Sequence, residues 1–97
     1  MESRTFEAVT FVWIRDGEPF EFELAGREAW ALSRLMAAAE KGVTPVSEPT
    51  GPRWSAYVHK LRRKGLDVET ITERHGGAFP GTHARYVLRS DVRLLEE

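Results

Sequence analysis

Gly42 and three prolines, at positions 45, 49 and 52, interrupt the chain near its middle. A proline inside a helix removes a backbone N–H and clashes with the preceding turn, so no long helix can cross this segment. Its composition permits at most one short helical turn, at Thr44-Pro45-Val46-Ser47. The chain must therefore fold from short elements placed on either side of the break.

A β-hairpin is predicted at residues 5–24. Residues 6–15 are rich in β-branched and aromatic side chains, and after Asp16-Gly17 the residues 20–24 alternate between apolar and acidic. Phe11 and Trp13 share one face of the first strand, while the other face is also apolar. Either both faces are buried or one of them contacts a partner.

A helix is predicted from Gly26 to Lys41, because Leu32, Leu35, Met36 and Ala39 follow the spacing of one helical face. We expect Gly42 to end this helix in the left-handed conformation that glycine adopts without strain. A helix and a hairpin are predicted after the break. The helix spans residues 52–64 with Pro52 as its first residue, and its Trp54, Val58 and Leu61 form a stripe typical of core packing. Residues 66–90 alternate in two runs around a long loop rich in glycine and proline, which predicts a hairpin.

Charge is distributed unevenly along the chain, although its net charge is only −1. Residues 1–49 hold nine acids and five Lys or Arg, whereas residues 50–97 hold six acids and nine Lys or Arg. The stretch 53–65 contains five of these cations and no acid. One helix is therefore strongly basic. The low net charge argues against indiscriminate binding of polyanions, but this local concentration of cations favours a polyanionic partner for the helix.

Several classes of function are disfavoured by the sequence. The chain has no cysteine, and His59, His75 and His83 lack the spacing of a zinc site, so neither a metal nor another cofactor is expected. No serine lies in a nucleophile elbow, so no enzyme activity is expected. No signal sequence or long apolar segment is present, and we expect a cytoplasmic protein without membrane contact. The length suits one domain, residues 1–97.

The segment from Arg53-Trp54-Ser55 to Leu66-Asp67-Val68-Glu69-Thr70 resembles the recognition helix and first wing strand of small winged helix-turn-helix proteins. Residues 76–90 resemble their wing, and residues 26–32 their first helix. Over roughly residues 20–92 the chain is similar to a group of short alphaproteobacterial and phage-associated winged-helix proteins. The resemblance implies an α+β winged helix-turn-helix, with the helix-turn-helix at 26–65, the wing at 66–90 and the N-terminal β-hairpin as an addition.

Binding of double-stranded DNA is the function that this reading predicts, in a small bacterial transcriptional regulator or mobile-element accessory factor. A basic helix fits the major groove and gains affinity by releasing counterions from phosphates. The predicted contacts lie on the helix and on the wing, at Arg53, Ser55, Ala56, His59, Lys60, Arg62, Arg63, Arg74, His75, His83 and Arg85.

The alternative is a protein-interaction module of the same fold, because a fold does not fix a function. It would use Phe11 and Trp13 of the N-terminal hairpin, either to form a homodimer or to bind another protein. Burial of both rings would argue against this alternative.

Overall fold

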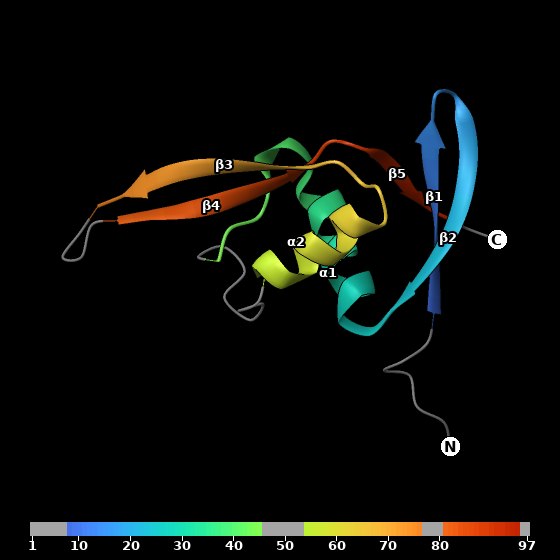
Figure 1. Ribbon diagram of the computed structural model, residues 1–97, viewed down its shortest axis with the longest axis horizontal. Coiled ribbons are helices and arrows are strands. Elements are labelled where there is room, and N and C mark those ends of the chain that lie inside the picture. The colour runs from blue at the N-terminus through green and yellow to red at the C-terminus, as the bar shows by residue number, and fades with distance from the viewer. Residues whose placement is uncertain (1–7, 46–53, 77–80, 96–97) are drawn as a thin grey trace, which may run out of the picture.

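The computed structural model describes residues 8–45, 54–76 and 81–95, except for the side chain of His75 (Figure 1). Helices and antiparallel strands both contribute to it, so the fold class is α+β as predicted. The elements are β1 (Ala8–Arg15), β2 (Glu18–Ala25), α1 (Gly26–Ala38), the short 3₁₀ turn η1 (Ala39–Lys41), α2 (Trp54–Arg63), β3 (Val68–His75), β4 (Gly81–Leu88) and β5 (Asp91–Leu94).

The N-terminal hairpin is present and forms part of a three-stranded antiparallel sheet with the order β2-β1-β5. Its turn has positive φ at both central residues, 51° at Asp16 and 81° at Gly17. This is the type I′ geometry that matches the twist of a two-residue hairpin, and an Asp-Gly pair favours it. β5 lies in the C-terminal residues, for which the sequence predicted no element.

The inner face of this sheet packs on the core. Phe11 is fully buried and its ring stacks on Phe22 at 5.7 Å between centroids. Trp13 is half-buried and lies over Gly65, where an added Cβ would approach its ring to 3.0 Å. Phe11 is therefore a core residue, and the prediction that it contacts a partner is wrong. Most of the Trp13 ring is also turned toward the protein.

Helix α1 buries one face, which includes Ala29, Leu32 and Leu35. The helix ends at Ala38, three residues before the predicted end, because Ala39 has a φ of 52° and the chain continues as η1. Gly42 has a positive φ of 74° as expected, but its ψ of 179° is extended rather than left-handed helical.

Gly42 is needed where α1 meets β4. Val43 and Tyr86 exchange two backbone hydrogen bonds of 2.9 Å, which bring the chain against β4. An added Cβ on Gly42 would lie 2.7 Å from the Tyr86 carbonyl oxygen and 2.8 Å from Val87 Cγ2. Only glycine fits this contact.

Helix α2 places Trp54, Val58 and Leu61 in the core, as predicted. The indole of Trp54 packs against Trp30 at 5.4 Å between ring centroids, and Tyr57 meets both rings edge-on. The predicted start of this helix at Pro52 lies outside the described residues. The same is true of Val46 and Ser47 in the predicted short turn, whereas Thr44 is buried beside β4.

The predicted wing is a two-stranded antiparallel hairpin of β3 and β4, in register from Val68↔Leu88 to His75↔Gly81. Figure 1 shows it extending away from the two helices, on the side opposite the N-terminal sheet. Val68 and Tyr86 are buried at its base, which anchors the hairpin to the core. None of the described helices is long and apolar enough to cross a membrane.

Candidate nucleic-acid interface

The side of α2 that faces away from the core carries four of the predicted contact residues. Because Trp54, Val58 and Leu61 point inward, the 3.6-residue period turns Ser55, Ala56, His59 and Arg63 outward. Ser55, His59 and Arg63 are exposed and Ala56 is half-buried. These four positions form one continuous stripe along the helix.

Positive charge is concentrated at the C-terminal end of this stripe. Lys60, Arg63 and Lys64 line a surface hollow of about 370 Å³ together with Glu28 of α1. The Lys60 ammonium lies 3.8 Å from a Glu28 carboxylate oxygen, and the lysine side chain is 59% exposed, so this pair is weak. Within the described part of the chain, Arg63 and Lys64 form no ion pair. No described acid therefore neutralises the charge of these two side chains.

Arg62 is used differently from its neighbour Arg63. Its guanidinium donates hydrogen bonds from Nε to the Val68 carbonyl oxygen at 3.0 Å and from Nη2 to Thr70 Oγ1 at 2.7 Å. Arg62 therefore joins the end of α2 to the first strand of the wing.

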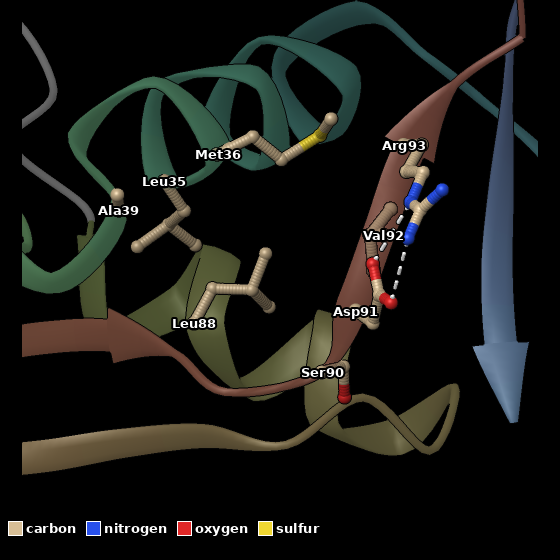
Figure 2. A pocket seen from close by; sticks show the side chains of 8 residues that line it. All are labelled: Leu35, Met36, Ala39, Leu88, Ser90, Asp91, Val92 and Arg93. Atoms are coloured by element: carbon tan, nitrogen blue, oxygen red, sulfur yellow. Dashed lines mark hydrogen bonds and ion pairs between the residues drawn. The ribbon is translucent and has the colours of Figure 1, made fainter. Parts of the chain in front are cut away.

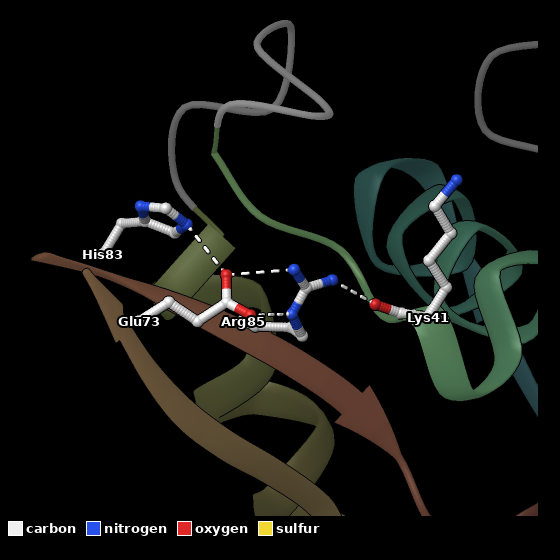
Figure 3. A network of polar contacts seen from close by, with 4 residues as sticks. All are labelled: Lys41, Glu73, His83 and Arg85. Atoms are coloured by element: carbon white, nitrogen blue, oxygen red, sulfur yellow. Dashed lines mark hydrogen bonds and ion pairs between the residues drawn. The ribbon is translucent and has the colours of Figure 1, made fainter. Parts of the chain in front are cut away.

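Of the predicted wing contacts, His83 and Arg85 form polar contacts within the protein, whereas Arg74 is exposed. Glu73 accepts two hydrogen bonds from the Arg85 guanidinium, and one of its oxygens lies 3.1 Å from His83 Nε2 (Figure 3). Arg85 also donates to the Lys41 carbonyl oxygen, which ties β4 to the end of η1. Arg74 is exposed and forms no ion pair among the described residues.

The Glu73 and Arg85 charges stabilise each other. The hydrogen bonds from Arg85, and then its positive charge, hold the pKa of Glu73 below the ordinary 4.5, with a smaller contribution from His83 and despite partial desolvation. The same hydrogen bond raises the pKa of the Arg85 guanidinium. Both groups stay ionised at neutral pH, so their formal charges cancel locally.

A family model described as "Winged helix domain" matches residues 21–97, which include α1, α2 and the β3–β4 hairpin. The chain belongs to this family. No curated protein and no solved structure matches the chain. The winged helix assignment agrees with the observed order of helix, helix and hairpin. Winged helix domains are in general DNA-binding modules and typically have no catalytic activity.

Two predicted contact residues are not positioned by the structure. Arg53 lies outside the described residues, and of His75 only the backbone is described. The described residues contain no group of three His, Asp or Glu side chains that could hold a metal ion.

Two residues of α1 that lie beside α2 were not predicted as part of the site. Arg27, at the start of α1, donates to the Tyr57 hydroxyl at 3.2 Å and covers the Trp30 ring at 4.9 Å. Glu28 places an acid beside Lys60 of α2. Both residues come from another helix, so the sequence of α2 held no signal for them.

Proposed function

We propose that this winged helix protein binds duplex DNA through the exposed face of α2 and the adjacent wing, as a small transcriptional regulator or mobile-element accessory factor. The observation that carries the proposal is the acid-free helix α2, at whose end Arg63 and the following Lys64 have no ionic partner in the described part of the chain. A B-DNA major groove accommodates an α-helix, and cations on that helix gain affinity by displacing condensed counterions.

Residues along the exposed stripe of α2 divide by position and chemistry. Ser55, Ala56 and His59 lie toward the middle and N-terminal half of the helix, the part of a recognition helix that reaches base edges. A serine hydroxyl can donate or accept, and an alanine methyl can contact the thymine methyl group. Lys60 and Arg63, near the C-terminal end, are suited to phosphates, which fix register without reading sequence.

The wing contributes beside the helix. Arg74 is the exposed cation of the described wing residues that has no ion pair, and we assign it a phosphate or minor-groove contact. His75 keeps this assignment as a prediction. Arg53 remains a predicted contact of the helix, to a guanine base edge or to a phosphate. Arg62 and Arg85 form hydrogen bonds within the protein that hold the wing against α2 and η1, and His83 contacts Glu73 inside the wing.

Fluorescence-anisotropy titration of a random-sequence duplex, repeated over a series of salt concentrations, tests this proposal. The test variant is Arg53→Ala/Arg63→Ala, and the control is Arg15→Ala/Arg93→Ala, which removes two cations from the N-terminal sheet. We expect salt-sensitive binding that the test variant weakens and the control retains. Absence of binding at low salt, or equal loss in both variants, contradicts the proposal.

A further inference from the structure

The N-terminal sheet has a long edge strand with an unusual charge pattern. Among the strands that the structure describes, β2 pairs only with β1, and its other side is a row of backbone donors and acceptors over Glu18–Ala25 that no described strand pairs with. β2 lies at the outer side of the molecule, away from the wing (Figure 1). A strand of this length normally needs protection against pairing with another chain.

The register shows which backbone groups face this open edge. A two-residue turn closes on a hydrogen-bonded pair, here Arg15 and Glu18, and hydrogen-bonded and non-hydrogen-bonded pairs then alternate. Pro19, Glu21 and Glu23 fall in the non-hydrogen-bonded pairs, so their backbone groups point away from β1. Proline in such a position costs no ladder hydrogen bond. Glu21 and Glu23 therefore present both N–H and C=O to the edge.

The side chains of these two residues add charge to the same edge. Glu21 and Glu23 lie on the outer face of the sheet, opposite Val12 and Thr10 of β1. Both are exposed, and neither forms an ion pair with any described residue. On the inner face of the same strand, Phe20 is 48% exposed. The edge thus combines acidic groups on one face with an apolar group on the other.

A second copy of this chain does not suit the edge. The two antiparallel registers that overlap two β2 strands most fully set Glu21 against Glu23, or Glu21 against itself and Pro19 against Glu23. Like charges directly opposite each other destabilise a strand pair. The complementary partner carries basic side chains on the outer face and apolar side chains on the inner face.

We propose that the free edge of β2 binds an extended segment of another protein in which Lys or Arg alternates with apolar residues. The segment adds as a fourth strand, with backbone hydrogen bonds to Glu21 and Glu23 and its cations beside their carboxylates. Because β2 lies away from the wing, this contact leaves the recognition helix open. The proposal is independent of DNA binding.

The test uses the whole protein, labelled with ¹⁵N, and a synthetic peptide in which lysine and valine alternate. We expect the backbone amides of Glu21 and Glu23 to shift and to gain protection from solvent exchange. A peptide of the same composition with its lysines in one block should bind at least fivefold more weakly, because it cannot place its charges on one face.

Glu21→Lys is the informative variant, and Glu40→Lys is its control, since Glu40 is exposed on η1 and the change in net charge is identical. We expect Glu21→Lys to weaken binding of the alternating peptide about five- to tenfold, and Glu40→Lys to change its affinity less than twofold. Equal effects of the two variants would overturn the proposal. So would equal binding of both peptides, shifts confined to β5, or absence of binding at millimolar peptide.

Discussion

Arg62 and Arg63 are adjacent arginines, yet their side chains lie in different surroundings. Arg63 is exposed and has no ion pair in the described part of the chain, whereas Arg62 is bonded to Val68 and Thr70. Replacing each with alanine should therefore separate DNA affinity from stability.

The magnitudes follow from these contacts. Losing one phosphate contact reduces the slope of log K against log salt concentration by about 0.9, which at ~0.1 M salt is roughly eightfold in affinity, or about 1.2 kcal/mol. Arg63→Ala should show this loss and change the free energy of unfolding by less than about 0.5 kcal/mol. Arg62→Ala should cost about 1 kcal/mol of stability, the ordinary net contribution of a hydrogen bond, because Arg62 is exposed and water weakens the contribution of its charge. Its melting temperature should fall by about 4–8 °C.

Salt-dependent anisotropy titrations and thermal denaturation of both variants measure the two quantities. The expected pattern is a lower salt slope with unchanged melting temperature for Arg63→Ala, and the reverse for Arg62→Ala. If Arg62→Ala lowers the slope by about one contact while Arg63→Ala does not, the assignment of these two side chains is wrong.

Three further changes test other parts of the structure. Gly42→Ala should destabilise the protein by about 2–5 kcal/mol, because its Cβ would meet the Tyr86 carbonyl and the positive φ is strained; Gly76→Ala, whose Cβ meets nothing within 4 Å, is the control in thermal melts. Glu73→Gln should lower the melting temperature at neutral pH. Since folding lowers the pKa of Glu73 below 4.5, its contribution is present above 4.5 and is lost as pH falls through the lower folded pKa, so the melting temperatures of variant and wild type should converge there; a constant gap would contradict this. Glu28→Gln should raise DNA affinity about twofold at low salt, because one acid ~8 Å from a phosphate costs about 0.5 kcal/mol in water; unchanged or weaker binding in anisotropy titrations would place Glu28 away from the DNA.

The elements of the fold were predictable where the sequence pattern is local. The Asp16-Gly17 pair favours the turn that the structure contains, and the spacing of Trp54, Val58 and Leu61 gave the buried face of α2 correctly. These features depend on residues close together in the chain. They need no knowledge of tertiary contacts.

Features that depend on distant residues were missed. β5 has only four residues, too few for a reliable alternation, and it forms because β1 offers an open edge. At the end of α1 the predicted helix was too long, since pairing of Val43 with Tyr86 draws the chain away.

The candidate site shows the same limit. The helical period separates Arg63, on the outward face of α2, from Arg62, which follows Val58 by four residues. The α2 sequence holds no sign that Arg62 bonds to Val68 and Thr70, because that contact depends on where β3 begins. Likewise, the pairing of Arg85 with Glu73 depends on the register of the wing.

A surface hollow between α1 and β5 has an apolar lining and a polar rim. Leu35, Met36, Leu88 and Val92 line it, and its polar rim is formed by Asp91 and Arg93, which bond to each other (Figure 2). The polar groups of the rim are thus already paired within the protein. We assign no ligand to this hollow.

The most direct test of DNA binding by the recognition helix is ¹H–¹⁵N shift mapping of the whole protein during titration with a short duplex at low salt. We expect the largest changes at Ser55, Ala56, His59 and Arg63, with smaller changes at Arg74 and none on β2. Changes confined to the N-terminal sheet, or the absence of any change, would contradict the proposed interface.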